Sequence, residues 1–247
     1  MKKMEVLGID IGGTGIKGAI VNVDTGELVS ERHRIPTPIG AKPNDVANEV
    51  TAMVNYFNWK GKVGCGFPTI ISKGKARSHG NIDSSWMNTQ VNTLFSEKTG
   101  LEFFIVNDAD AAGLAEIKMG AGKAVPGVVI LITVGTGLGS GVFVDGKLVP
   151  NVELGTVPYK EYERFEYYAS DSARKREDLS YKKWGKRFNK FLKFTEQTFS
   201  PDLIIIGGGA SKKMYKFKEA LEISVPVVSA KYKNNAGIIG AAMTAVQ

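Results

Sequence analysis

The 247-residue sequence predicts an α/β protein of two similar domains, and two observations carry this prediction. Short apolar runs, typical of buried strands, alternate along the chain with longer amphipathic stretches, typical of helices. One strand–loop–strand pattern also occurs twice, 122 residues apart, at Gly13-Thr14-Gly15 and Gly135-Thr136-Gly137. A repeat at half the chain length predicts two related domains, each opening with a β-hairpin whose tip is a Gly/Thr loop. We expect the two loops to face each other across a cleft.

Strands are expected where apolar residues run together between glycines or charged residues. In chain order these runs are 6–11, 19–23, 27–29, 63–67, 103–106, 128–134, 142–144, 147–149, 203–206 and 225–228. Helices are expected where apolar residues recur at intervals of three and four. These stretches are 45–57, 87–98, 110–119, 179–199 and 236–246. The uncharged stretch 124–144 contains Pro126 and five glycines, so we expect two strands around a loop there and no membrane span.

The composition excludes several classes of protein. With 43% hydrophobic residues the chain can bury a large core, and one cysteine with two histidines cannot form a disulfide framework or a Cys/His zinc site. Lys2 and Lys3 precede an apolar stretch that Glu5 and Asp10 interrupt, which is too short for a signal peptide and predicts a cytoplasmic protein. The net charge of +7 suits nucleic acid, a membrane surface or a polyanionic substrate, but charge alone favours ordinary solubility. No base-reading motif accompanies the charge, so nucleic acid is not expected.

The two Gly/Thr loops are suited to binding phosphate. Glycines leave backbone N–H groups open to a ligand, and Thr14 and Thr136 add hydroxyl donors. Structural turns use the same residues, but two matched copies favour a shared function. Neither loop is a P-loop or a dinucleotide fingerprint, because both lead into strands. Asp10 ends the first strand, and it is suited either to hold Mg²⁺ through water or to cap its own loop.

Phosphoryl transfer to an alcohol also needs a base near the attacking hydroxyl. Asn107-Asp108 follows the apolar run 103–106 and precedes an Ala-rich helix, which is a suitable place for this base. Asp108 is equally suited to be the N-cap of that helix, and the residues alone leave both roles open.

A basic segment lies between residues 174 and 193, with nine basic and two acidic residues. Four of the basic residues share one face of the expected helix: Lys183, Lys186, Arg187 and Lys190. This stripe is either a solvated helix face or a track for a long polyanion.

Five motifs, in order and spacing, resemble the ROK family of sugar kinases. They are residues 9–14 with Lys17, residues 107–112, residues 135–139, residues 153–155 and residues 207–209. Within the family the chain looks most like the polyphosphate glucokinase branch, on the segments 34–38, 81–86, 168–174, 179–184 and 200–206. That branch lacks the Cys-rich zinc motif of the family, as this chain does.

The resemblance implies the two-domain, actin-like (ribonuclease H-like) sugar kinase fold with duplicated β-hairpin phosphate loops. The small N-terminal domain would be 1–107, with a C-terminal helix at 235–247 returning to it, and the large domain would be 108–234. It also implies an enzyme that transfers a phosphoryl group from polyphosphate, ATP or both to the 6-hydroxyl of glucose, with Mg²⁺ as cofactor. The resemblance favours the stripe of Lys183, Lys186, Arg187 and Lys190 as a track for a polyphosphate chain. A homodimer is implied as well.

The resemblance further assigns roles to residues. Asp108 would be the general base, and the sugar would be bound by Asn81, Asn107, Asp108, Glu153 and Glu166. The donor would be bound by Asp10, which would also hold Mg²⁺, and by Gly12, Gly13, Thr14, Lys17, Thr133, Gly135, Thr136, Gly137, Gly139, Gly207, Gly208 and Gly209.

One position departs from the family pattern. Thr156 stands where the family usually has a histidine that contacts the sugar. The departure leaves open an ATP-dependent ROK kinase for another hexose or an amino sugar. A catalytically silent sugar-binding or regulatory protein is a further alternative, because relatives of the family include repressors.

Overall fold

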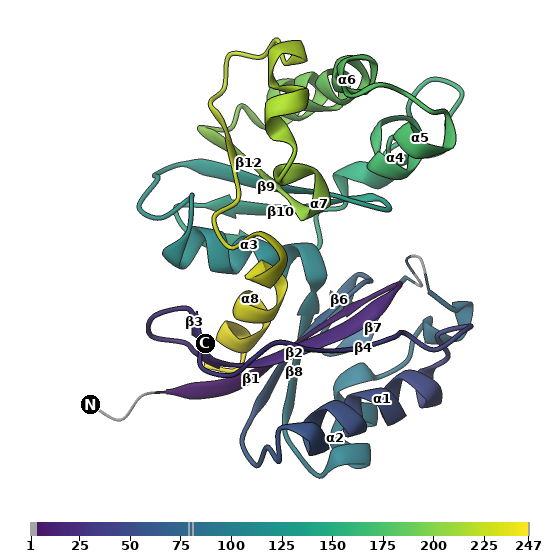
Figure 1. The fold of residues 1–247 in the computed structure, drawn as a ribbon, viewed down its shortest axis with the longest axis vertical. Helices are drawn as coiled ribbons and strands as arrows, with labels where there is room; N and C mark the ends of the chain where they lie inside the picture. Colours follow the sequence, from purple (N-terminus) through teal and green to yellow (C-terminus); the bar gives the residue numbers. More distant parts are fainter. Residues whose placement is uncertain (1–3, 79, 81, 247) are drawn as a thin grey trace. The chain divides into compact units, whose positions relative to one another are not determined.

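The computed structural model describes residues 4–246 except 79 and 81, and the chain forms two compact units (Figure 1). Unit 1 contains residues 1–115 and 235–247, and unit 2 contains residues 116–234. The division falls inside α3 (Asp108–Met119), after Ala115, whereas the family resemblance implies a boundary before Asp108. Each unit combines a β-sheet with helices, so the predicted α/β class is confirmed.

Unit 1 is built on a mixed sheet with the strand order β3-β2-β1-β5-β8, in which β4 also pairs with β2. Its strands are β1 (Glu5–Gly12), β2 (Gly15–Asn22), β3 (Glu27–Leu28), β4 (His33–Ile35), β5 (Val63–Phe67) and β8 (Phe103–Asn107), with a separate ribbon of β6 (Ile71–Ser72) and β7 (Lys75–Ala76). Because β1, β5 and β8 are parallel, their carboxyl ends meet at one edge of the sheet. The helices of this unit are α1 (Pro43–Tyr56), α2 (Val91–Thr99), α8 (Ala236–Thr244) and the first part of α3.

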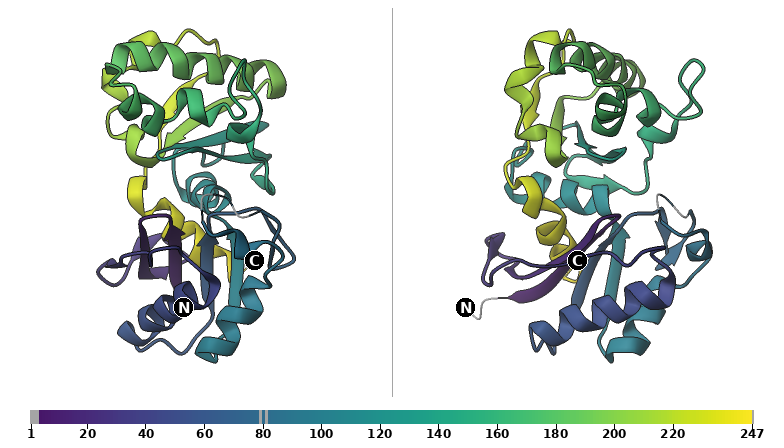
Figure 2. Two further views of the ribbon diagram at one scale, coloured as in Figure 1. Left: turned by 90° about the vertical axis from the view of Figure 1, so that its right-hand side faces the viewer. Right: turned by 45° about the vertical axis from the view of Figure 1, so that its right-hand side comes forward.

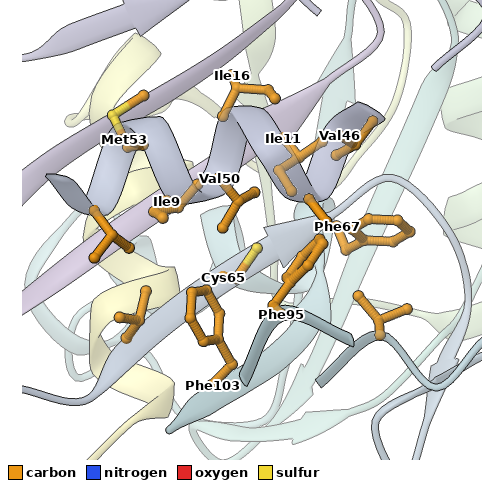
Figure 3. Packing of buried hydrophobic residues seen from close by; sticks show 14 of the residues in the cluster. Ile9, Ile11, Ile16, Val46, Val50, Met53, Cys65, Phe67, Phe95 and Phe103 are labelled. Carbon is orange, nitrogen blue, oxygen red and sulfur yellow. The ribbon is translucent and has the colours of Figure 1, made fainter. Parts of the chain in front are cut away.

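One face of this sheet carries the main apolar core of unit 1. Side chains alternate along β5, so Cys65 packs with α1 and α2 whereas Gly64 faces the other side. Figure 3 shows Cys65 among core side chains that include Val50, Phe95 and Phe103. Burial, with the charge of Asp10 as a second cause, raises the pKa of the Cys65 thiol well above its ordinary value. Cys65 therefore acts as a small apolar side chain in this core.

The opposite face of the sheet is covered by α8, and glycines let the helix come very close. A Cβ atom at Gly64 would lie 1.8 Å from the Ala241 carbonyl oxygen, and one at Gly240 would lie 1.6 Å from the Ala111 carbonyl oxygen. Both views of Figure 2 show α8 against the sheet of unit 1. The backbones therefore touch where any other residue would separate them, and α8 is an integral part of unit 1.

Unit 2 has a sheet with the strand order β11-β10-β9-β12-β13, in which β9 and β10 form the second hairpin. Its strands are β9 (Val128–Val134), β10 (Leu138–Val144), β11 (Lys147–Val149), β12 (Leu203–Gly207) and β13 (Val227–Ser229). The helix α6 (Tyr181–Phe199) buries Trp184, Phe188 and Phe191 against this sheet. The shorter helices are α4 (Glu166–Ala169), α5 (Asp171–Arg176) and α7 (Gly208–Ser211).

Most of the expected elements are present, but their ends differ. The helix expected at 87–98 begins only at Val91, because Ser84–Trp86 forms a 3₁₀ turn that buries Trp86. The sequence pattern did not indicate β4, β6, β7, α4, α5 or α7. The stretch 124–144 forms the expected two strands around a loop. Among the described residues, every helix is too short or too polar to cross a membrane.

The chain passes between the units after Ala115 and after Asn234, and a buried carboxylate lies beside both connections. Glu116 Oε2 accepts hydrogen bonds from the backbone N–H groups of Ala121 (2.8 Å) and Lys231 (3.0 Å), and Oε1 accepts one from Tyr232 (2.7 Å). One side chain of unit 2 therefore holds together the segment that enters this unit and the segment that leaves it.

Candidate active site

A row of charged residues crosses the first hairpin. In the sheet register Asp10 of β1 pairs with Lys17 of β2, and Lys17 pairs with Arg34 of β4. The Lys17 ammonium lies 2.9 Å from Asp10 Oδ2. Because directly paired residues project from the same face of a sheet, the row places one carboxylate and two cations side by side.

The tip of this hairpin is the first Gly/Thr loop. Gly12 pairs with Gly15, which leaves Gly13 and Thr14 as an exposed two-residue loop. Arg34 Nη2 donates a 2.6 Å hydrogen bond to the Thr14 carbonyl oxygen. The guanidinium group of Arg34 therefore lies against the loop that is expected to bind phosphate. Arg34 was not among the donor-binding residues expected from the sequence. The pairing of β4 with β2, which places Arg34 beside the loop, cannot be read from the sequence. The only sequence signal for Arg34 is that it belongs to the segment 34–38, which resembles the family.

Asp108 lies where β8 ends and α3 begins. Asn107 Oδ1 accepts hydrogen bonds from the backbone N–H groups of Ala109 (2.9 Å) and Asp110 (3.1 Å), and Asn107 Nδ2 donates to the Thr69 carbonyl oxygen (3.1 Å). These are the bonds of a helix N-cap, so Asn107 supplies the cap that the sequence allowed for Asp108. Asp108 is half-buried in the first helical turn, where the helix dipole stabilises a carboxylate.

Asp10 and Asp108 belong to the same edge of the sheet. In the parallel register Asp10 pairs with Gly66, and a Cβ atom at Gly66 would lie 3.6 Å from the Asp108 Cα atom. The Asp10 carboxyl carbon lies 3.0 Å from the place of a Cβ atom at Gly237, at the start of α8. In the described part of the chain no group of three or more His, Cys, Asp or Glu residues could hold a metal. A single carboxylate suits Mg²⁺, whose remaining ligands in such sites are water and substrate phosphates.

The donor residues expected in unit 2 lie together in three adjacent strands. Thr133 of β9 pairs with Gly139 of β10 on one side and with Gly207 of β12 on the other. The second Gly/Thr loop, residues 135–137, connects β9 to β10. Gly208 has a φ of +69° and bridges to Val134, and a Cβ atom there would lie 2.6 Å from the Val134 carbonyl oxygen. The glycine run 207–209 thus continues the same surface as the second loop.

The two glutamates expected to bind sugar are both anchored near β10. Glu166 is 7% exposed, and its Oε2 accepts a 3.2 Å hydrogen bond from the Leu138 N–H, at the end of the second loop. Arg164 lies 3.3 Å from Glu166 Oε1. The Glu153 segment is attached to β10 by the Ser140 hydroxyl, which accepts a 2.9 Å hydrogen bond from the Leu154 N–H.

Two further expected positions behave differently. The Thr156 hydroxyl donates a 2.8 Å hydrogen bond to the Glu153 carbonyl oxygen, so it stabilises the turn that carries Glu153. Asn81 lies outside the described residues.

The basic stripe of α6 divides into two kinds of residue. Lys183, Lys186 and Lys190 are exposed. Arg187 lies 2.6 Å from Glu177 and 4.7 Å from the ring centroid of Tyr168. The hydrogen bond from Arg187 is the main cause that lowers the pKa of the Glu177 carboxyl. Arg187 thus connects α6 to the segment before it, whereas the three lysines point to solvent.

Comparison with known proteins gives a consistent result. The family model described as the ROK family matches residues 6–153. A polyphosphate glucokinase of Mycobacterium tuberculosis (strain CDC 1551) is 45% identical over 240 residues, which cover 97% of this chain and 90% of that protein. The crystal structure of an inorganic polyphosphate/ATP-glucomannokinase from Arthrobacter sp. strain KM is 42% identical with a TM-score of 0.95, covering 98% of both chains. A ROK family glucokinase from Streptomyces griseus, solved with glucose and AMPPNP, shares the fold at 22% identity with a TM-score of 0.85, covering 99% of this chain and 100% of that one.

Proposed function

This chain belongs to the ROK family, and we propose that it is a kinase that transfers a phosphoryl group from inorganic polyphosphate, and also from ATP, to the 6-hydroxyl of glucose. The observation that carries the proposal is the 45% identity to a polyphosphate glucokinase over 97% of the chain. The likeness to a polyphosphate/ATP-glucomannokinase over the whole fold supports both donors.

In the proposed reaction Asp108 is the general base. It accepts the proton of the sugar 6-hydroxyl as the oxygen attacks the terminal phosphorus of the donor. The bond from that phosphorus to the bridging oxygen breaks, and the donor leaves as polyphosphate shortened by one phosphate, or as ADP. The cap supplied by Asn107 fixes the first turn of α3, so the backbone that carries Asp108 is held in place before substrate arrives. Asn81, Asn107, Glu153 and Glu166 bind the other hydroxyls, since carboxylates accept hydrogen bonds from a polyol and side-chain amides both accept and donate them.

The donor phosphates are bound by backbone N–H groups and hydroxyls of the two Gly/Thr loops and by the glycine run 207–209. Lys17 and Arg34 add positive charge beside the first loop. Asp10 holds Mg²⁺ through water, and the ion supplies charge neutralisation on the transferring phosphoryl group. Glu166 accepts a hydrogen bond from Leu138, so one residue connects sugar binding to the position of the second loop.

The first test is the formation of glucose 6-phosphate by the purified protein with polyphosphate or ATP. We expect Asp108→Asn to fold normally and to lose at least ~100-fold in kcat, the lower range for general base catalysis. Asp45→Asn is the matched control, because Asp45 is an exposed aspartate in the first turn of another helix of unit 1. Turnover by Asp108→Asn close to that of Asp45→Asn would remove Asp108 from the chemistry.

We also propose, from the family likeness, that the protein is a cytoplasmic homodimer. Light scattering tests the assembly, because the chain mass is 26.7 kDa and a dimer has twice that mass. A monomer at assay concentration, with full activity, would contradict this part of the proposal.

A further inference from the structure

We propose that a cluster of cations around Tyr181 in unit 2 binds the donor chain beyond the phosphates that react. The Tyr181 cluster consists of Tyr181 at the start of α6, Arg174 of α5, and Lys213 and Lys216 after α7. The inference rests on the proposed function, since it names the part of the protein that distinguishes a long polyphosphate from a short donor.

The cluster is defined by three cations above one aromatic ring. The guanidinium carbon of Arg174 lies 4.4 Å from the ring centroid of Tyr181, and the ammonium nitrogens of Lys216 and Lys213 lie 5.3 Å and 5.7 Å from it. All three fall within the ~6 Å range of a cation–π contact. The Tyr181 ring in turn packs edge-on against the buried Trp184, with 6.2 Å between centroids. The ring is therefore a fixed platform on which the cations converge.

The charges of the cluster are not balanced. Asp171 accepts a 2.7 Å hydrogen bond from Arg174 and lies 2.9 Å from Lys175, so one carboxylate serves two cations. Within the described residues, no carboxylate lies within ion-pair distance of Lys213 or Lys216, and both are exposed. Like charges held around one ring repel each other, and an anion placed between them relieves this repulsion. The cluster is thus organised for a ligand with negative charge.

The position of the cluster points to the donor as this ligand. Lys213 follows the glycine run 207–209 by four residues. The short helix α7 begins within this run, at Gly208, and ends at Ser211, so the same element leads from the donor loop to the cluster. Both belong to unit 2. A long linear polyphosphate whose end lies at the glycine run carries further phosphates, and their charges must be placed nearby. ATP and tripolyphosphate have too few phosphates to extend from the glycine run to the cluster.

The chemistry of the cluster also suits a repeating anion better than a single one. Exposed ammonium groups bind phosphate as point charges without fixed geometry, so successive phosphates can exchange places on them. This mode of binding depends on the number of phosphates and is weakened by salt, as for proteins on single-stranded nucleic acids. We therefore expect the cluster to lower the KM of long chains and to leave the kcat unchanged.

The test compares the double variant Lys213→Ala/Lys216→Ala with a matched double control, Lys123→Ala/Lys147→Ala, which removes two exposed lysines elsewhere in unit 2. For the cluster variant we expect the KM of long-chain polyphosphate to rise about fivefold for each lysine at low salt, with kcat unchanged. The KM values of tripolyphosphate and ATP should stay within about twofold of the control. The salt dependence of log KM for the long chain should also become shallower, by about 0.7 for each lost contact.

Further variants test the Tyr181 ring and the α6 stripe separately. Tyr181→Leu removes the ring and should raise the KM of the long chain. Tyr181→Phe removes only the hydroxyl and keeps the ring, so it should leave this KM unchanged. The triple variant Lys183→Ala/Lys186→Ala/Lys190→Ala removes the exposed part of the α6 stripe. A rise in KM for the cluster variant, alone or together with the triple variant, supports the cluster. A rise for the triple variant alone, or an equal rise for ATP and the long chain in the cluster variant, overturns it.

Failure of the proposed function gives a different result. If the unaltered protein forms no glucose 6-phosphate from any donor, the cluster is tested by measuring the binding of long-chain polyphosphate. Calorimetry at two salt concentrations gives the dissociation constants. Weaker binding by the cluster variant than by its control then supports the cluster, and equal binding overturns it.

Discussion

Replacing Glu116 with glutamine tests whether one carboxylate holds the two connections between the units. The carboxylate accepts three backbone hydrogen bonds, from Ala121, Lys231 and Tyr232, and is fully buried. Glutamine has one acceptor oxygen. In its better orientation the amide oxygen keeps the bonds of Ala121 and Lys231, and the amide NH₂ group then faces the Tyr232 N–H.

The cost of this change can be worked from the geometry. One hydrogen bond to a charged group is lost, which costs about 1.5–3 kcal/mol, and two buried donors face each other, which costs about 1–3 kcal/mol more. The neutral amide is easier to bury than a carboxylate, which offsets part of this. We expect Glu116→Gln to lower the free energy of unfolding by about 2–4 kcal/mol, with a fall in Tm of about 4–16 °C for a chain of this size.

The assay combines denaturant unfolding with hydrogen exchange. The amides of Ala121, Lys231 and Tyr232 should exchange faster in Glu116→Gln, while amides in the core of β5 should not. Glu219→Gln, at an exposed glutamate of unit 2, is the control. A Glu116→Gln protein within about 0.5 kcal/mol of that control, with unchanged exchange at the three amides, would refute the reasoning.

Three other outcomes follow from the structure. Gly64→Ala should destabilise the protein by at least about 3 kcal/mol in denaturant unfolding, because its Cβ atom would lie 1.8 Å from a backbone oxygen of α8 and neither backbone can move alone. The Cys65 thiol should not react with a thiol reagent at pH 8 until denaturant is added, because burial raises its pKa and closes access; reaction at the rate of a free thiol would contradict this. Glu177→Gln should cost less than about 1 kcal/mol at pH 7. Arg187 holds the pKa of Glu177 in the folded protein below its ordinary 4.5, so the contribution of this ion pair to stability is present above pH ~4.5. It is lost as the pH falls through the lowered pKa of the folded state. The unfolding curves of the unaltered protein and of Glu177→Gln should therefore converge in acid.

The fold was predictable where local patterns agree with packing. The strands β5 and β9 have the predicted bounds because each is a buried run bounded by turn residues. The start of α2 was not predictable, because the burial of Trp86 in a 3₁₀ turn depends on residues distant in the sequence. Short helices such as α5, with six residues, contain too few turns for a periodic pattern.

The candidate site was predictable from its motifs but not from its pairings. The motifs indicated Asp108, but whether Asp108 or Asn107 caps α3 depends on the residue at which the helix begins, and spacing does not fix this to one residue. Arg34 is placed beside Thr14 by the register of β4 on β2. Helical spacing put Arg187 on one stripe with three lysines, and its pairing with Glu177 became visible only in three dimensions.

The close fit of α8 also bears on how the protein is made. A ribosome synthesises residues 1–115 first and reaches α8 only after the 119 residues of unit 2. At about 5–20 residues per second this interval is about 6–24 s, during which α3 already lies beside Gly66 but the part of the glycine-lined face that α8 covers has no helix on it. The first unit to be synthesised is thus the last to be completed, and a nascent chain stalled within unit 2 would present that bare face to chaperones.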